Sequence, residues 1–325
     1  MNKTIKKVLA LGLSAVLVGS VFAGCSAQDS KYKIGIIQSQ QHAALDEATR
    51  GFQDAVTQAL GAENVEITLQ NASGDSATCA TIANQFVADG VDLIMANATA
   101  ALQASMQATA SIPIVATSVT DYATALEIAD WTGVTGINVT GTSDLAPLDQ
   151  QAAMIQELCP DAQTVGILYC SAEPNSVYQA NVVEENLTSM GLAVNIYTCA
   201  DTNEIASITT QACQEVDVIY IPTDNTIASA TAAVDQIAGP AGIPVIAGEE
   251  GICKGCGVAT LSISYYDIGV RAGEMAVEIL QNGADPSTMQ IETATDLTKK
   301  YVPSRAQALG ITIPSDYVAI EETAE

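Results

Sequence analysis

The residues best suited to chemistry are acidic side chains that follow apolar runs in the second half of the chain. Asp224 comes directly after one such run, and Glu249 and Glu250 come after the next. Paired carboxyl groups can act as general acid and base, as in glycosidases, but adjacent residues on a strand point to opposite faces and cannot easily flank one bond. The acids therefore favour binding of a cationic group, and the sequence leaves open which of Glu249 and Glu250 faces a ligand.

The chain contains a single histidine, His42, so neither a catalytic triad nor a histidine-rich metal site is available. The phosphate loop GxxxxGK, the nucleophile elbow GxSxG and the zinc motif HExxH are also absent from the sequence. The sequence therefore predicts a protein that is not an enzyme and uses no metal or cofactor. His42 follows an apolar run, where it is either a hydrogen-bonded structural residue or part of a binding pocket.

Eight cysteines are present, and seven remain if Cys25 is set aside, an odd number that prevents complete internal pairing. Cys253 and Cys256 form the one CxxC pair, which we interpret as a surface-loop disulfide or two free thiols because no second such pair exists. Cys170 and Cys199 each end an apolar run and could pair if these runs are neighbouring strands.

The sequence contains an internal duplication of the elements that position these residues, and this repeat is the strongest structural signal in the sequence. Four short runs rich in Val and Ile recur in the same order, as expected for strands buried on both faces of a parallel sheet. The pairs are residues 34–37 and 165–168, 65–69 and 193–197, 91–95 and 216–220, and 112–115 and 243–246. Helical patterns alternate with them at residues 43–60, 77–89, 102–110, 177–190 and 227–238. The sequence thus predicts an α/β fold with two doubly wound parallel-sheet lobes.

In such lobes the usable polar groups follow the carboxyl ends of the strands, and two facing edges can hold a ligand between them. The expected ligand-binding residues are Gln38, His42, Asn97, Thr99, Thr117, Ser118 and Asp121 in lobe one, and Ser171, Asn175, Ser176, Asp224, Asn225, Glu249 and Glu250 in lobe two.

The two edges differ in charge, since lobe two carries the acids and lobe one mainly hydroxyls and amides. This asymmetry suits a zwitterionic amino acid with its ammonium group on lobe two and its carboxylate on Thr99, Thr117 or Ser118. Thr99 could instead only cap the following helix, and Asp224 could likewise be an N-cap. The sequence does not decide between these roles.

The first 24 residues have the order of a secretory signal, with three lysines, an apolar run at residues 8–22 and small residues up to Cys25. FAGC (residues 22–25) resembles a bacterial lipobox, which implies lipidation of Cys25 and a membrane anchor made of lipid alone, with residues 25–32 as a linker. The net charge of −26 argues against nucleic acid as a partner.

Several segments of the mature chain resemble the ABC substrate-binding family that contains the tryptophan- and tyrosine-transporter binding proteins. They are KIGIIQ (33–38), HAALD (42–46), NASGD (71–75), PTDNT (222–226) and SYYDIG (264–269). The resemblance implies a type I periplasmic-binding fold with a three-stranded hinge, an amino-acid-like ligand, ABC permease subunits as partners and a monomer. It also implies lobes that are discontinuous in sequence: residues 33–141 with 258–290, and residues 142–257 with 291–325.

Three other functions fit the sequence less well. An anchored hydrolase needs a convergent nucleophile and base, which are not evident, and a transcriptional regulator of this fold needs a basic DNA-binding headpiece in place of the signal. A sugar or nucleoside ligand favours stacked aromatic side chains, whereas the chain has one Trp and three Phe.

Overall fold

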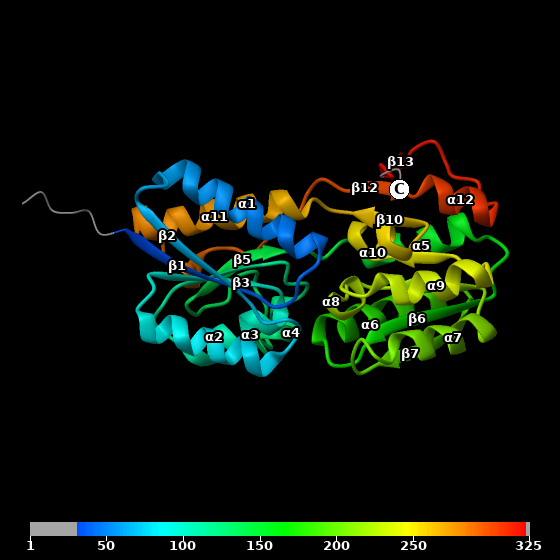
Figure 1. The fold of residues 1–325 in the computed structure, drawn as a ribbon, viewed down its shortest axis with the longest axis horizontal. Helices are drawn as coiled ribbons and strands as arrows, with labels where there is room; N and C mark the ends of the chain where they lie inside the picture. Colours follow the sequence, from blue (N-terminus) through cyan, green and yellow to red (C-terminus); the bar gives the residue numbers. More distant parts are fainter. Residues whose placement is uncertain (1–30, 323–325) are drawn as a thin grey trace, which may run out of the picture. The chain divides into compact units, whose positions relative to one another are not determined.

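The computed structural model describes residues 31–322, so the expected signal segment and Cys25 lie outside the described residues. Residues from Tyr32 onward form one compact unit that contains two α/β lobes, each built around one sheet (Figure 1). The predicted fold class is confirmed.

Lobe one contains a six-stranded parallel sheet in the order β2 (Val65–Asn71), β1 (Tyr32–Gln38), β3 (Leu93–Asn97), β4 (Ile114–Thr117), β5 (Val139–Ser143), β11 (Glu292–Thr293). Its helices are α1 (Ala43–Leu60), α2 (Ser76–Asp89), α3 (Thr99–Ala108), α4 (Tyr122–Ala125) and α11 (Tyr265–Asn282), followed by the 3-10 turn η1 (Pro286–Thr288).

Lobe two repeats this order with β7 (Ala193–Cys199), β6 (Thr164–Cys170), β8 (Val218–Ile221), β9 (Val245–Ala247) and β10 (Ala259–Ser262), then adds β12 (Thr298–Tyr301) and β13 (Val318–Ala319). Its helices are α5 (Leu148–Leu158), α6 (Pro174–Ser189), α7 (Ile205–Glu215), α8 (Asn225–Ala228), α9 (Thr231–Ala241), α10 (Glu250–Cys256) and α12 (Pro303–Leu309). The shared strand order 2-1-3-4-5 confirms the duplication and places a switch point beside the first strand of each lobe.

The three chain crossings between the lobes lie a few residues after the expected positions. Sheet pairing keeps all of β5 in lobe one, since residues 114–116 pair with residues 139–141, and it keeps β10 in lobe two. The third crossing, expected near residue 291, also lies further along the chain, because β11 still pairs with Thr142 and Ser143 of β5 in lobe one. Apolar runs locate strands, but they do not show where a strand leaves its sheet.

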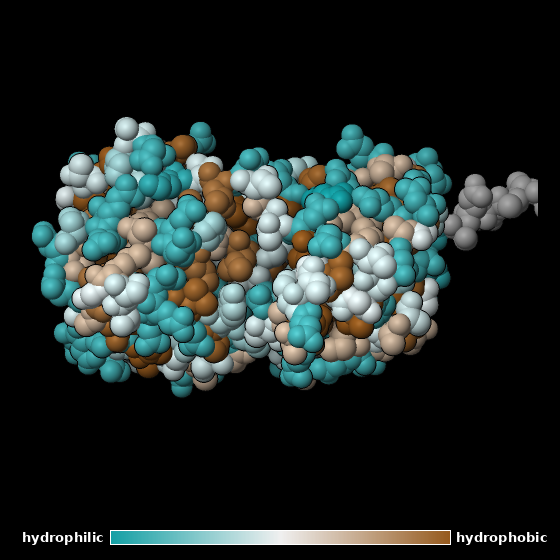
Figure 2. All heavy atoms as spheres, turned by 180° about the vertical axis from the view of Figure 1, so that it is seen from behind, coloured by the Kyte–Doolittle hydropathy of each residue, from teal (hydrophilic) through white to brown (hydrophobic). Residues whose placement is uncertain are grey.

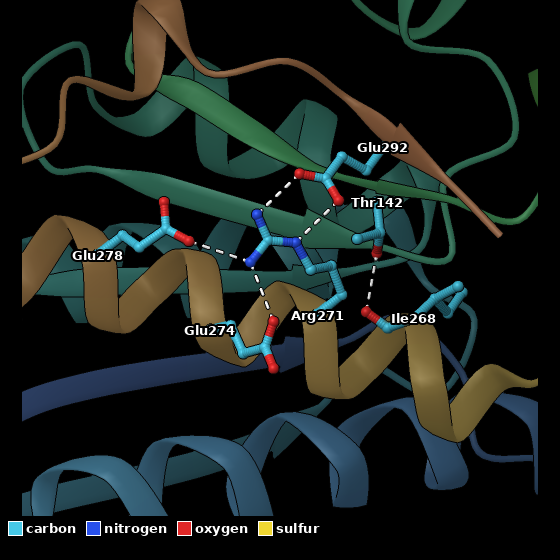
Figure 3. A network of polar contacts seen from close by, with 6 residues as sticks. All are labelled: Thr142, Ile268, Arg271, Glu274, Glu278 and Glu292. Carbon is cyan, nitrogen blue, oxygen red and sulfur yellow. Dashed lines mark hydrogen bonds and ion pairs between the residues drawn. The ribbon is translucent and has the colours of Figure 1, made fainter. Parts of the chain in front are cut away.

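An ion-pair cluster holds the last crossing segment to lobe one (Figure 3). The Arg271 guanidinium on α11 donates from Nε and Nη2 to the two carboxylate oxygens of Glu292 on β11, at 2.8 and 2.7 Å. Its Nη1 also donates to Glu274 and Glu278, both at 3.0 Å. This bidentate geometry fixes β11 against α11, and it lowers the pKa of Glu292.

The helix predicted over residues 227–238 is wrong in one respect, because the structure divides this region into α8 and α9. The Ser229 hydroxyl donates to the Thr226 carbonyl at 2.8 Å, and Ala230 leaves the helical conformation with φ −139°. Serine hydroxyls compete in this way with the helical hydrogen-bond ladder.

Helices α1 and α11 pack closely through small residues. Gly51 lies against the backbone of Tyr266, and Gly269 lies against the Ala48 carbonyl, so a Cβ atom at either glycine would collide with backbone atoms. The contact holds the first and the last long helices of lobe one together.

Gly269→Ala is expected to lower the free energy of unfolding by about 1–3 kcal/mol, the usual cost of overpacking a well-packed contact. Gly239→Ala is the matched control, because Gly239 is also helical and a Cβ atom added there would meet no other atom within 4 Å. Urea unfolding of both variants checks this prediction, which fails if the two substitutions have equal effects.

Hydrophilic residues cover much of the face shown in Figure 2, with hydrophobic residues interspersed in smaller areas. This surface agrees with the acidic composition of the chain. Among the described residues, no helix has both the length and the apolar character needed to cross a membrane.

Candidate functional site

A cleft of about 270 Å³ lies between the carboxyl edges of the two sheets. Lobe one contributes the loops after β1 and β2 and part of α3, including Gln40 and Ala100. Lobe two contributes the loops after β6, β7 and β8, including Glu173 and Asn225. The carboxyl edges of both lobes therefore meet at one cavity, as the strand pattern predicts.

Glu173 organises the wall of the cleft formed by lobe two. One carboxylate oxygen accepts hydrogen bonds from the backbone and hydroxyl of Thr226, both at 2.7 Å. The other accepts from the Asn225 backbone at 3.1 Å, the Asn225 side chain at 2.7 Å and the Asn175 side chain at 3.2 Å. A carboxylate with this many donors is held rigidly, so it presents a fixed negative charge at the start of α8.

Asp224 lies directly behind this wall, with 1% of its surface exposed. Its carboxyl group caps α8 by accepting from the Ile227 amide at 2.8 Å, and it also accepts from the Cys170 amide at 2.7 Å. Burial and the nearby charge of Glu173 raise the pKa of Asp224. The structure therefore assigns Asp224 the capping role that the sequence left open. Among residues 31–322, no cationic side chain forms an ion pair with this carboxyl group.

Lobe one presents a buried amide network at the ends of β1 and β3. The Thr49 hydroxyl of α1 donates to Gln38 Oε1 at 2.7 Å and accepts from Asn97 Nδ2 at 3.0 Å. Gln38 Nε2 also donates to Asp46 at 2.7 Å. Both polar atoms of the Gln38 side chain therefore bond to residues of α1 and hold the start of that helix. In contrast, Asn97 Oδ1 has no hydrogen-bond partner among the described residues.

Four buried polar atoms along the lobe-one edge have no hydrogen-bond partner in the described structure. They are Gln40 Oε1, His42 Nδ1, Asn97 Oδ1 and Ser118 Oγ. The remaining two such atoms belong to threonines within β5 and β10. Buried polar groups are almost always satisfied, so these four atoms mark candidate positions for a polar ligand. Of the four residues, Gln40 is among those that line the cleft of about 270 Å³.

Two residues on this edge have unusual backbone conformations. Ala98 has φ +83° and Ser118 has φ +56°, and both are buried. Ala98 occupies the N-cap position of α3, and Thr99 is its first helical residue. Of the two roles that the sequence left open for Thr99, the structure therefore removes the N-cap. Residues with strained backbone are frequent at ligand sites. Here Ala98 joins β3 to α3, and no side chain caps the first backbone amides of α3.

The other expected hydroxyl, Thr117, is buried and accepts from the Thr142 hydroxyl of β5 at 2.9 Å. Asp121 caps α4 through the Thr124 amide at 2.7 Å. Helix α4 of lobe one contacts α6 of lobe two. Burial raises the pKa of Tyr178 on α6, and the charge of Asp121 adds to this shift.

His42 connects the two lobes. Its Nε2 lies 3.1 Å from Asn225 Oδ1, so a residue after β1 contacts the start of α8. Burial lowers the pKa of His42, in spite of the opposing effect of the Asn225 hydrogen bond. A neutral ring with one free nitrogen can donate to or accept from a ligand.

The residues predicted after β6 have different environments. Ser171 is exposed, and its hydroxyl donates to the Cys199 carbonyl at 3.3 Å. Asn175 lines the cleft, whereas Ser176 is fully buried and donates to the Thr223 carbonyl at 3.4 Å. Of these three residues, only Asn175 combines a place on the cleft wall with side-chain contacts to Glu173.

Glu249 and Glu250 take separate roles. Glu249 is 3% exposed and caps α10 through the amides of Gly251 and Ile252. Glu250 forms an ion pair with Lys300 at 2.5 Å. Glu249 is therefore a buried helix cap, and burial raises its pKa to about 7.

The raised pKa of Glu249 gives an expected pH dependence. The folded protein holds this proton more tightly than the unfolded chain, so the stabilisation is complete below about pH 4.5 and is lost as the pH rises to about 7. The loss attributable to this group is roughly 3 kcal/mol. Thermal melting from pH 4 to pH 8 should show a smaller decline for Glu249→Gln than for the wild type. Parallel curves for the two proteins would contradict this assignment.

The list of expected binding residues omitted Glu173, which lines the cleft, and two buried polar residues outside the cleft lining, Asp144 and Gln179. Asp144, just after β5, is buried and accepts from the Thr120 hydroxyl and from Tyr265, both at 2.9 Å. Gln179, inside α6, donates to the Thr223 carbonyl at 3.2 Å and accepts from its amide at 3.1 Å. The expected binding residues were the polar residues that follow the duplicated apolar runs. Asp144 lies at a chain crossing and Gln179 lies within a helix, so this rule selects neither of them.

The cysteines also depart from part of the sequence interpretation. Cys253 and Cys256 lie within α10 in the core of lobe two, so a surface-loop disulfide is wrong and both are free thiols. Cys170 and Cys199 are aligned on the neighbouring strands β6 and β7, and they too are free thiols. Within the described residues, no cluster of three or more potential ligands could hold a metal ion.

The sequence pattern of the family described as ABC transporter substrate binding protein matches residues 33–323. The chain belongs to this family. A tyrosine-binding protein from Clostridioides difficile (strain R20291) is 34% identical over 307 residues, which cover 89% of each chain. Proteins of this substrate-binding family are extracytoplasmic and bind solutes, and the family is not one of enzymes.

Two solved structures of substrate-binding proteins are similar to this chain. A Streptococcus pneumoniae domain in complex with L-Trp is 35% identical, with a TM-score of 0.84 over 88% of this chain and 97% of that one. A ligand-free, open substrate-binding protein from Clostridium difficile is 36% identical, with a TM-score of 0.67 over 89% of this chain and 100% of that one.

Proposed function

We propose that the protein captures an amino acid, with aromatic amino acids as the first candidates, between its two lobes and delivers it to an ABC permease without catalysis. The observation that carries this proposal is the set of unsatisfied polar atoms on lobe one opposite the carboxyl groups of lobe two. Relatives described as tyrosine-binding and as bound to L-Trp support the same ligand class.

The ligand carboxylate is assigned to Ser118 and the start of α3 beside Thr99. The N-terminus of a helix favours a negative charge, and Ser118 has a free hydroxyl group. The ammonium group is assigned to the acids of lobe two, with Glu173 on the cleft wall and Asp224 buried behind it. Among the described residues, neither carboxyl group forms an ion pair with a cationic side chain, and burial raises the pKa of Asp224. His42 and Asn225 close the cleft over the ligand.

Mass spectrometry of small molecules released from gently purified and then denatured protein tests the ligand class. An amino acid should be recovered at close to one equivalent per chain. Recovery of a sugar or a nucleoside at that level would replace the amino acid as the ligand.

Membrane attachment is proposed to depend on lipidated Cys25, with the mature protein acting as a monomer. Cys25→Ser is expected to release the protein from membranes or to leave the signal uncleaved, because the lipid has no other attachment point in the lipobox-like segment. Membrane fractionation with immunodetection checks this prediction. A cleaved Cys25→Ser protein that stays membrane-bound would contradict it.

A further inference from the structure

Two of the free cysteines occupy equivalent positions on adjacent strands at the edge of the cleft. Cys170 ends β6 and Cys199 ends β7, and the parallel register pairs them directly. Parallel neighbours lie about 4.8 Å apart, which is within the range of Cα separations that a disulfide spans. The two residues therefore need no change of register to form a bond.

The two sulfur atoms also face the same region. The Cys170 sulfur lies 3.5 Å from the Ala200 carbonyl oxygen, and the Cys199 sulfur lies 3.7 Å from the Tyr169 carbonyl oxygen, so each reaches the opposite strand. A hydrogen bond from the Cys199 thiol lowers the pKa of Cys170. The thiolate is the reactive form of a cysteine, so this contact favours Cys170 as the attacking sulfur.

We propose that Cys170 and Cys199 are a redox-active pair that forms a reversible disulfide on the lobe-two side of the cleft. Cys170 lines the cleft, and the loops that follow both cysteines line it as well. The family is extracytoplasmic, and disulfides persist in oxidising compartments of that kind. The bond would join the β6 and β7 loops directly beneath the ligand-facing residues.

The oxidant is a disulfide of the glutathione class. The Cys170 thiolate attacks one sulfur of the oxidant, which forms a mixed disulfide and releases one thiolate. Cys199 loses its proton to solvent and attacks the Cys170 sulfur, which releases the second thiolate. The two protein thiols lose two electrons and two protons, and one oxidant disulfide becomes two thiols.

The other cysteines supply internal controls. Cys253 and Cys256 are also close in sequence, but they are fully buried in the core of lobe two, and burial raises the pKa of both thiols. Cys213 on α7 is only half-buried, so it reports general thiol oxidation.

The test is peptide mapping of the intact mature protein after incubation with a series of oxidised-to-reduced glutathione ratios and alkylation of the remaining thiols. The expected product is one peptide pair linked through Cys170 and Cys199, reversed by reductant, while Cys253 and Cys256 stay reduced. Cys199→Ser should stop the reaction at a single glutathione adduct on Cys170, and Cys213→Ser should leave the linked pair unchanged. Recovery of Cys170 and Cys199 as separate thiols at every ratio, or prior linkage of Cys253 to Cys256, overturns the proposal.

Discussion

Asp224→Asn is expected to weaken amino-acid binding by roughly 30-fold to several-thousand-fold, since losing one partner of a desolvated charge pair costs about 2–5 kcal/mol. Asp224 is buried, and its carboxyl group lies near Glu173 without a nearby cation that lowers its pKa. A ligand ammonium would supply the missing positive charge. Calorimetric titration of the variant and the wild type measures the difference.

The matched ligand for this test is the deaminated acid with the same side chain, whose affinity Asp224→Asn should change much less. Asparagine is as good an N-cap as aspartate, but it offers only one acceptor oxygen for the amides of Ile227 and Cys170. The empty protein should therefore lose about 1 kcal/mol of stability. Full-strength amino-acid binding by the variant would remove Asp224 from the ammonium site.

Ala172→Trp is expected to reduce ligand affinity by about 10- to 100-fold or to abolish it, because the indole would occupy a cleft of only about 270 Å³. Ala172 lines the cleft and is exposed, so the empty protein should accept the larger side chain with little loss of stability. Titration and melting of the same samples separate the two effects.

Ala241→Trp is the matched control for this substitution, because Ala241 is exposed at the end of α9 and lies outside the cleft lining. It should bind ligand as the wild type does. If Ala172→Trp and Ala241→Trp bind equally well, the ligand does not use this cleft.

The architecture could be predicted from the sequence because the apolar runs of a doubly wound sheet are continuous and recur in order. The duplicated runs locate four strands of each sheet, and they also predict that polar residues such as Asn97 and Asn225 lie at the facing edges. The direction of each polar side chain could not be predicted. Asp224 and Glu249 follow strands as expected, but both carboxyl groups turn back to cap helices.

The crossings and the helix break were not predictable for a related reason. β5 and β11 are held in lobe one by pairing between segments that are far apart in the sequence, and Arg271 adds an ion pair over a separation of 21 residues. Asp144 belongs to such a crossing, where no periodic pattern marks a polar site. Local patterns specify elements, whereas these features depend on tertiary contacts.

The most direct test of amino-acid capture is calorimetric titration of L-tyrosine and L-tryptophan, followed by the other amino acids, into protein stripped of ligand by unfolding and refolding. Saturable binding of at least one amino acid at one site per chain is predicted, with much weaker binding of its deaminated analogue. The absence of saturable binding for every amino acid at millimolar concentration, from protein that refolds fully, would contradict the central claim.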